Sequence, residues 1–540
     1  MKYIFFLIPL LLFGEICEEK LPCNAVLCSD LRGIILQGND TLLSVPREGI
    51  HAQNVDVPGN FIHLKACLTS YLHKELTFET LAQIQKTTSD YYQECDRPLL
   101  TVGIPEQDIT DGILRLTLIE STLGTVKSKG NRWFPDSMLT SQIRLERGSP
   151  ITSKTIIEDI AWLNRNPYRL TNIVFTPGSE PNSTDIELIT QDRFPLRFYG
   201  GGDNTGTIIT GRARWFVGVD WAWNLLFDQI FSYQFTSSSD FKNLLSHTGS
   251  YRAFLPWRHV LHIYGGYAST KPDIRDFASE GYNAQGSLRY QMPLILFPDS
   301  FYLQPVVGFD YKLQRSSLIF TGQNQIPISD DLAAISQIVV GTELSFENAE
   351  HRTLFQWFFF WSPGEIFPHQ SPNDFNTLRT GVVPNYLYST LLLAYQYNYR
   401  FFTLWFQGRG QKATKPLIQS EEFALGGYDT VRGYDEREFI SDNGFCFNIE
   451  LRSPHWSLVR CRKYRDEWTF LVFFDYGLGT SQLHVNDEQK STFLLGIGPG
   501  IRLAISPFLK FRLDYGFKLH KLHFEDTSMG KLHLGGLVSF

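Results

Sequence analysis

The feature that most constrains the fold is a long series of alternating segments that fills the chain after Phe194. Apolar residues, many of them aromatic, occupy every second position in segments such as "RARWFVGVDWAWN" and "WTFLVFFDYG". Polar or glycine- and proline-rich breaks such as "TSSSDFKN" and "TGQNQIPISDD" separate these segments. Successive side chains of a strand point to opposite faces, so this period predicts β-strands with one apolar and one polar face.

The length and composition of this region predict a closed sheet that spans a bilayer. The region from residue 195 to 540 holds 346 residues, and at roughly 20 to 22 residues per strand with its connection it suits about sixteen strands. In hydrocarbon every backbone polar group needs an internal partner, which a closed antiparallel barrel provides. The chain is 14% aromatic and only 19% charged, whereas a soluble chain carries about a quarter charged residues. An array of soluble β-sandwiches is the alternative, and the aromatic excess argues against it.

The N-terminus predicts export. Lys2 precedes the apolar run "YIFFLIPLLLF", which has the length of a signal-peptide core and is too short to span a bilayer as a helix. We therefore expect a signal peptide over residues 1–17 and a short N-terminal segment over 18–30. Cys17 leaves lipidation as an alternative. No apolar run of about 18 residues follows residue 20, so no transmembrane helix is expected.

Charge and cysteine content exclude several classes of function. The net charge is −7 and no basic block occurs, so nucleic acid is not an expected partner. The seven cysteines suit an oxidising compartment, where disulfides are plausible although their pairing stays open. Their spacing matches no zinc pattern, so no metal site is predicted. The chain contains neither HExxH nor GxSxG, so we expect neither catalysis nor a cofactor.

A mixed pattern before the alternating region predicts two small α+β modules. Each follows the order strand, helix, helix, strand, strand, the first over residues 31–122 and the second over 123–193. In the second module Thr155 and Glu158 have the spacing of a capping box. One irregular α+β domain is the alternative. The insert at 41–60 in the first module either touches a ligand or only extends a loop.

Two short stretches are candidate sites. In "LGGYDTVRGYDEREF", from Leu425 to Phe439, glycines and tyrosines surround Arg432. By itself this stretch fits a surface hairpin whose glycines take positive φ, and it lacks the Lys-Ser/Thr ending of a phosphate-binding loop. A loop with a partner elsewhere in the chain is the third interpretation. The chain ends on "HLGGLVSF", and the spacing of the following residues matches the insertion signal that barrel-assembly machinery reads on a last strand: His533, Gly535, Val538 and Phe540.

These motifs resemble those of the TpsB-type transporters of two-partner secretion, the haemolysin secretion/activation family. "VGIPEQDITDGILRLTLIES" and "WLNRNPYRLTNIVFTPGS" are similar to passages of the two modules of that family, and "YGGGDNTGT" resembles the exit of its first barrel strand. The resemblance covers about residues 31–540. The matching module residues are Pro105, Gln107, Asp111, Gly112, Leu163, Asn164, Asn166, Pro167, Pro177 and Gly178.

The resemblance implies two periplasmic POTRA modules and, over residues 194–540, a sixteen-strand barrel in the bacterial outer membrane. It implies that the modules bind an unfolded, TpsA-like secreted exoprotein and that the barrel passes it outward. The expected partners are this exoprotein, outer-membrane lipid and, during biogenesis, the barrel-assembly machinery. An outer-membrane assembly factor of the same superfamily and a structural porin are the alternatives. Family members often carry an N-terminal plug helix, for which Glu18 to Asp30 leaves no room.

The resemblance also implies a lumenal site. "VRGY" is similar to the arginine-bearing tip of the sixth extracellular loop, which folds back into the barrel and meets an F-x-D-x-G motif on a wall strand. We expect Arg432 to bond the carboxylate of Asp475 in two places and to pin the loop inside. The implied residues are Val431, Arg432, Gly433 and Tyr434 at the loop tip, Phe473, Asp475 and Gly477 on the wall, and Gly496, Gly498 and Gly500 in a glycine motif on the next strand.

Overall fold

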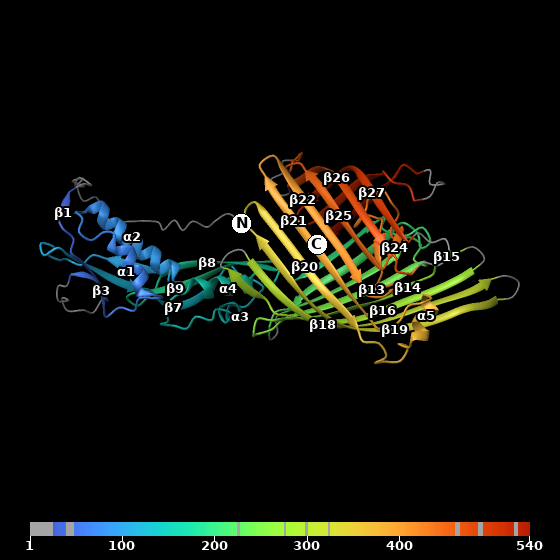
Figure 1. Ribbon diagram of the computed structural model, residues 1–540, viewed down its shortest axis with the longest axis horizontal. Coiled ribbons are helices and arrows are strands. Elements are labelled where there is room, and N and C mark those ends of the chain that lie inside the picture. Colours follow the sequence, from blue (N-terminus) through green and yellow to red (C-terminus); the bar gives the residue numbers. More distant parts are fainter. Residues whose placement is uncertain are drawn as a thin grey trace. The chain divides into compact units, whose positions relative to one another are not determined.

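The computed structural model describes residues 25–38, 48–223, 227–274, 277–297, 301–321, 325–459, 465–483, 490–522 and 528–540. The expected signal peptide and residues 18–24 lie outside the described residues, as do Cys17, Cys23 and Cys461. The chain divides after Arg193 into two compact units, which Figure 1 draws in blue to teal and in green to red.

The first unit begins with a four-stranded sheet and two helices. The strand order is β3-β2-β6-β5, and β2 runs parallel to both of its neighbours. Leu64 and Leu68 of the first helix and Ile84 of the second are fully buried in the core of this sheet, because their spacing places them on one helical face. The elements are β1 (Val26–Cys28), β2 (Gly33–Gln37), β3 (Gly49–Gln53), α1 (Phe61–Thr69), β4 (Leu76–Thr77), α2 (Phe78–Glu94), β5 (Leu100–Gly103) and β6 (Ile113–Glu120).

The insert at 41–60 contains an element that the sequence did not predict. Its residues Gly49–Gln53 form β3, which pairs in parallel with β2 at the edge of the sheet. "GIHAQ" has no clear alternation, so its strand character depends on the neighbouring strand. The insert therefore adds an edge strand to the sheet.

The second half of this unit is a three-stranded sheet with two helices, in the strand order β7-β9-β8. The capping box expected at Thr155 and Glu158 is wrong. The N-cap is Thr152, three residues earlier, and the Glu158 carboxylate instead accepts a hydrogen bond from Arg144. The elements are β7 (Thr122–Lys129), α3 (Asp136–Thr140), α4 (Ser153–Leu163), β8 (Arg169–Pro177) and β9 (Ser183–Asp192).

Two motif residues of this unit form hydrogen bonds with backbone N–H and C=O groups that have no partner on a neighbouring strand. The Gln107 amide accepts from the Arg115 N–H and donates to the Arg115 carbonyl, each at 2.8 Å. The Asn164 amide makes the same two bonds with Thr171, accepting at 2.7 Å and donating at 2.9 Å. Both side chains thus replace a missing strand neighbour, which explains an amide at each position.

Replacing Asn164 by Ala removes both bonds to Thr171 and leaves that backbone without a partner. We expect the unfolding free energy of the 25–193 unit to fall by about 2 kcal/mol, roughly one per lost bond. Urea unfolding of this unit measures the change. Asn172→Ala on the exposed side of β8 is the matched control. An equal effect of the two substitutions would contradict the proposed role of the Asn164 amide.

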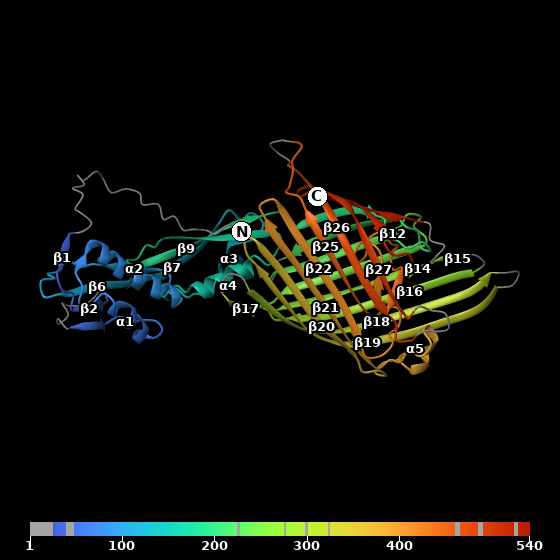
Figure 2. The same ribbon diagram turned by 45° about the horizontal axis from the view of Figure 1, so that its top comes forward.

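The second unit is a closed antiparallel barrel, as the alternation predicted. β15 and β17 are short extensions of their neighbours, which pair directly with each other, so sixteen principal strands form the wall. The first and last strands close it by pairing from Tyr199↔Ser539 to Asp203↔Gly535. Figures 1 and 2 show the strands inclined side by side. The strands are β10 (Leu196–Asp203), β11 (Arg214–Trp223), β12 (Gln229–Ser238), β13 (Leu244–Phe254), β14 (Val260–Thr270), β15 (Asp273–Ile274), β16 (Phe277–Gln291), β17 (Leu294–Phe297), β18 (Phe301–Thr321), β19 (Gln325–Glu347), β20 (His351–Ser362), β21 (Tyr386–Tyr399), β22 (Phe402–Ala413), β25 (Asn443–Arg452), β26 (Asp466–Thr480), β27 (Ser491–Ile505), β28 (Leu509–Lys518) and β29 (Gly530–Ser539).

The alternation of the sequence separates the two faces of the wall. On β11, Trp215, Val217 and Trp221 are exposed on the outer face, while Arg214 and Ala222, which have the opposite parity, are buried. A lipid-facing band of aromatic and aliphatic side chains and a polar interior are what a membrane barrel requires. Within the described residues, no helix is long and apolar enough to cross a membrane.

The two ends of the barrel differ in their connections. We call the end at which β10 begins and β29 finishes the turn end, and the opposite one the loop end. At the loop end α5 (Pro372–Leu378) lies beside β19, and Figure 2 shows it there. The connection from β22 to β25 contains the short pair β23 (Phe423–Leu425) and β24 (Phe439–Ser441). This connection, residues 414–442, carries the "VRGY" stretch.

Candidate functional site

The loop of residues 414–442 has its tip buried inside the barrel. Val431, Arg432 and Tyr434 are 0%, 2% and 1% exposed. Gly433 has a φ of +101°, and a Cβ at this position would approach the Gly516 carbonyl of β28 at 3.0 Å. Only glycine suits both this backbone conformation and this close approach. The tip therefore presses its backbone against the wall.

Arg432 is bonded to Asp475 of β26 through three hydrogen bonds. The guanidinium donates from Nε to Oδ2 at 2.7 Å and from Nη2 to Oδ1 at 2.8 Å, and the Arg432 backbone N–H donates to Oδ2 at 3.0 Å. Its Cζ also lies 3.6 Å from the centre of the Phe473 ring. The two-point fork expected from the sequence is present, together with a backbone bond and a stacked ring, which suits the planar guanidinium.

Several further ionic groups of this site were not predicted from the sequence. Arg432 Nη1 donates to Glu450 of β25 at 2.7 Å, and Arg502 of β27 donates to Asp514 of β28 at 2.7 Å. Arg452 donates to Glu450 at 2.7 Å. Three cations thus face three anions, so the buried cluster is neutral overall. The cluster consists of Arg432, Arg452, Arg502, Glu450, Asp475 and Asp514.

The glycine motif on β27 lies directly opposite the wall motif on β26. Gly496 pairs with Asp475 and Gly498 with Phe473. A Cβ on Gly496 would overlap the Arg432 carbonyl oxygen, and one on Gly498 would lie 2.9 Å from the Phe473 ring. Gly500 is next to Asp514. The glycines provide the room in which the loop tip and its stacked ring lie.

A methyl group on Gly516 tests this close approach. The Gly516→Ala Cβ would overlap the backbone of Arg432 and Gly433, so the tip has to shift, at a cost of about 1–3 kcal/mol. We expect trypsin to cleave after Arg432 in the intact barrel about tenfold faster than in wild type. Gly286→Ala on β16 is the control, because its Cβ would meet no atom within 4 Å. Resistance of both variants equal to that of wild type would contradict the close packing.

The C-terminal strand β29 contacts the loop tip through His533, which was predicted as part of the insertion signal. His533 is fully buried, and its Nε2 accepts from the Gly433 N–H at 3.0 Å. Gly535 pairs with Asp203 of β10, while Val538 and Phe540 are 40% and 78% exposed on the outer face. The inward parity of His533 could have indicated this lumenal contact, because an imidazole on the lipid face would be costly.

The same loop has a second anchor on the opposite part of the wall. The Glu421 carboxylate accepts from Lys312 of β18 at 2.9 Å, from Gln337 of β19 at 2.9 Å and from Tyr388 of β21 at 2.8 Å. Glu421 is 5% exposed, and the Gln411 amide also donates to its carbonyl at 2.8 Å. The loop is thus fastened to two sides of the barrel, and we call this contact the Glu421 anchor.

A third contact fixes the ends of the loop at the rim. Asp442, fully buried, accepts from Arg379 Nη1 and from the Leu417 N–H, each at 2.7 Å. Arg379 follows α5, whose Phe375 shares an apolar core with Leu417. The neighbouring loop is therefore bound to the base of the 414–442 loop.

A cavity of about 590 Å³ remains inside the barrel beside the Glu421 anchor. Its wall on β12 to β16 is mostly neutral and polar, with Gln234, Thr248 and Gln285 among the lining residues, and Lys312 and Glu421 border it. Neutral hydrogen-bonding groups can bind the backbone of an extended peptide with little sequence demand. In the described part of the chain no group of three or more His, Cys, Asp or Glu could hold a metal ion. The four described cysteines form no disulfide.

Comparison with known proteins identifies relatives over most of the chain. Residues 368–503 match the family model described as "Haemolysin secretion/activation protein ShlB/FhaC/HecB". The "Heme/hemopexin transporter protein HuxB" of Haemophilus influenzae (strain 86-028NP) is 22% identical over 469 residues, covering 81% of this chain and 77% of the relative. The "Outer membrane transporter CdiB" of Dickeya dadantii (strain 3937) is 22% identical, covering 84% and 79%.

Two solved structures are similar in fold. CdiB from Escherichia coli aligns with a TM-score of 0.74 at 16% identity, covering 99% of this chain and 94% of that structure. BamA from Haemophilus ducreyi lacking POTRA domains 1–3 aligns with a TM-score of 0.50 at 11% identity, covering 88% and 97%. The likeness extends over the whole chain in the first case.

Proposed function

Because the chain belongs to the haemolysin secretion/activation family of TpsB-type transporters, we propose that it moves one unfolded exoprotein through its barrel and that the loop of residues 414–442 controls the passage. It is a protein of the bacterial outer membrane and acts in two-partner secretion. The observation that carries the proposed control is the fastening of a single loop to two sides of the lumen, by Arg432 and by Glu421. A loop placed in this way narrows the path that cargo has to take.

We assign the parts of the chain accordingly. Residues 1–17 are the proposed signal peptide, residues 31–122 and 123–193 the two periplasmic POTRA modules, and 194–540 the barrel. The edge strands β3 and β5 of one sheet and β7 and β8 of the other are suited to pair with an extended segment of cargo, since an open sheet edge presents free backbone groups. Outer-membrane lipid and the barrel-assembly machinery are the other proposed partners, the latter through the C-terminal signal.

The roles of the two anchors are proposed to differ. Arg432 has bonds to two carboxylates and a stacked ring inside a neutral cluster, so it is suited to keep the tip in place. The Glu421 anchor depends on Lys312 as its cation and borders the open cavity. It is therefore the contact that yields when cargo enters.

The similarity to BamA leaves a second candidate, an outer-membrane assembly factor. Such a factor acts on many barrels, whereas a secretion transporter acts on one exoprotein. Within the described residues, two larger sheets with packed helices, β3-β2-β6-β5 and β7-β9-β8, precede the barrel, and an assembly factor would be expected to bring more POTRA modules. This favours the secretion function.

A stalled cargo tests passage through the lumen. The exoprotein that this chain is proposed to export is fused at its C-terminus to a tightly folded domain, so that its translocation stops part-way. A photo-crosslinking residue at Gln285, which lines the cavity, is expected to capture the stalled exoprotein. The same residue at Val217, which is 58% exposed on the outer face, is the control. Capture at Val217 and none at Gln285 would contradict transport through the barrel interior.

A further inference from the structure

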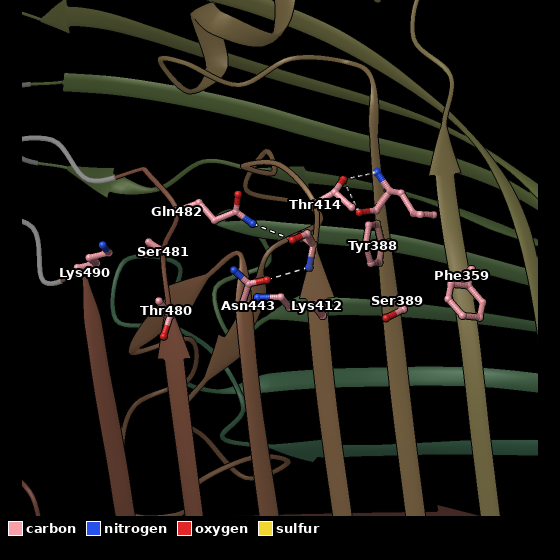
Figure 3. Close-up of a pocket in the computed structure, with 12 residues that line it drawn as sticks. Phe359, Tyr388, Ser389, Lys412, Thr414, Asn443, Thr480, Ser481, Gln482 and Lys490 are labelled. Carbon is pink, nitrogen blue, oxygen red and sulfur yellow. Dashed lines mark hydrogen bonds between the residues drawn. The ribbon is translucent and has the colours of Figure 1, made fainter.

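A hollow of about 790 Å³ lies at the loop end of the barrel, over β20 to β27 (Figure 3). Alternation along the strands shows that it opens on the outer face. Gln411 and Tyr388 reach inward to Glu421, so their neighbours Lys412 and Ser389 point outward. Both of these neighbours line the hollow.

The hollow exists because the strand ladder ends early at this place. The pairing of β22 with β25 stops at Gln411↔Gly444, so Ala413, which pairs with Tyr388 of β21 on its other side, has no partner on β25. Side chains replace the ladder, because Asn443 accepts from the Ala413 N–H at 2.8 Å and Gln482 donates to the Ala413 carbonyl at 2.8 Å. Figure 3 shows both bonds. The wall therefore stays closed while its outer surface is recessed.

The charge of the hollow is positive. Lys412 and Lys490 line it together with the hydroxyl groups of Ser389, Thr480 and Ser481, and none of the lining residues is acidic. Neither lysine forms an ion pair with another described residue. By contrast Lys271, at the loop end of β14, is 2.6 Å from Glu280. Among the described residues, the two lysines of the hollow are thus cations without an ionic partner.

The side of the hollow that faces the membrane is apolar. Phe359 and Leu387 line it and are 37% and 38% exposed, and Leu391, further from the loop end on the same face, is 41% exposed. Cations and hydroxyls next to an exposed aromatic and aliphatic surface match an amphipathic molecule with an anionic head and hydrocarbon chains.

We propose that this hollow binds the phosphorylated head group of an outer-leaflet glycolipid. Lys412 and Lys490 neutralise the phosphate, the hydroxyls of Ser389 and Thr480 donate hydrogen bonds to its oxygens, and Phe359 and Leu387 contact the acyl chains. Charge-assisted bonds to phosphate are stronger than neutral ones. The bound lipid would brace the rim at the place where the ladder between β22 and β25 is incomplete. The site depends on the location of the barrel in the outer membrane and not on the transport of cargo.

Lipid binding to the purified full-length protein tests the proposal. The protein is kept in a neutral maltoside detergent and titrated with bisphosphorylated lipid A, and native mass spectrometry counts the bound lipid. Each lysine is expected to contribute roughly fivefold to the affinity for the lipid. The Lys412→Gln/Lys490→Gln variant is therefore expected to bind about thirtyfold more weakly than wild type. Lys271→Gln is the matched control and is expected to bind as wild type does. Resistance to unfolding in SDS at room temperature verifies that each barrel is folded.

The other arms of the experiment distinguish the sources of the phosphate. Lipid A with its phosphates removed is expected to bind weakly, and inorganic phosphate at the same concentration is expected not to displace bound lipid A. Equal binding by wild type and the double lysine variant would overturn the proposal. Displacement by inorganic phosphate would overturn it as well, because the site would then be one for a small anion.

Discussion

Arg432→Ala is expected to reduce export of the exoprotein more than tenfold at unchanged abundance of the barrel. The substitution removes the fork on Asp475 and the bond to Glu450, and both carboxylates are almost fully buried. An uncompensated buried charge costs about 3–5 kcal/mol, which is enough to release the loop tip from the wall. Export is measured as exoprotein in the culture medium relative to the cells.

The control for Arg432→Ala is Arg437→Gln, which changes an exposed arginine of the same loop. It is expected to export as wild type does. Arg432→Lys is expected to fall between the two, because an ammonium keeps the charge but not the planar fork. A tenfold effect corresponds to about 1.4 kcal/mol, and a twofold effect to less. If Arg432→Ala exports within about twofold of wild type, the proposed role of Arg432 is contradicted.

Glu421→Gln is expected to open the lumen while the Arg432 contact stays intact. The substitution leaves the Lys312 ammonium, whose side chain is 18% exposed, without its carboxylate. The loop segment around residue 421 then loses its hold on β18, and water and ions enter the space beside it. The single-channel conductance of the purified barrel in a planar bilayer is expected to rise severalfold.

The matched control is Arg315→Gln, on the same hairpin as Lys312. The side chains of Arg315 and Asp330 are 44% and 55% exposed. An exposed ion pair of this kind contributes about 0–1 kcal/mol to stability. Its loss is expected to leave the conductance unchanged. If Glu421→Gln conducts no better than Arg315→Gln, the Glu421 anchor does not close the lumen.

The parts of the fold that the sequence predicted are those with a local period. Alternating apolar residues and regular breaks are visible along a single strand, so about sixteen antiparallel strands could be predicted, and the closed barrel confirms them. The capping box of α4 was predicted wrongly, because the Thr155 and Glu158 spacing occurs inside the helix, whose N-cap is Thr152. The strand β3 was missed, because its short sequence becomes a strand only beside β2.

The site could be predicted only where a motif marks both partners. Arg432 and Asp475 are 43 positions apart, and each lies in a stretch that resembles a family motif. Glu450 and His533 were missed as partners of the loop tip, and Lys312 as the partner of Glu421, because a single polar residue on a strand carries no local pattern. Their inward parity is visible in the sequence, but which inward residues meet depends on the curvature of the wall and on the path of the loop.

The most direct test of the account is export in a strain that lacks this chain. The proposed exoprotein cargo is measured in the periplasm and in the medium, and the abundance of the other outer-membrane barrels is measured in the same cells. The account predicts that the exoprotein stays in the periplasm, that the other barrels are unchanged, and that the wild-type chain restores export. Normal export without the chain, or a general loss of outer-membrane barrels, would contradict it.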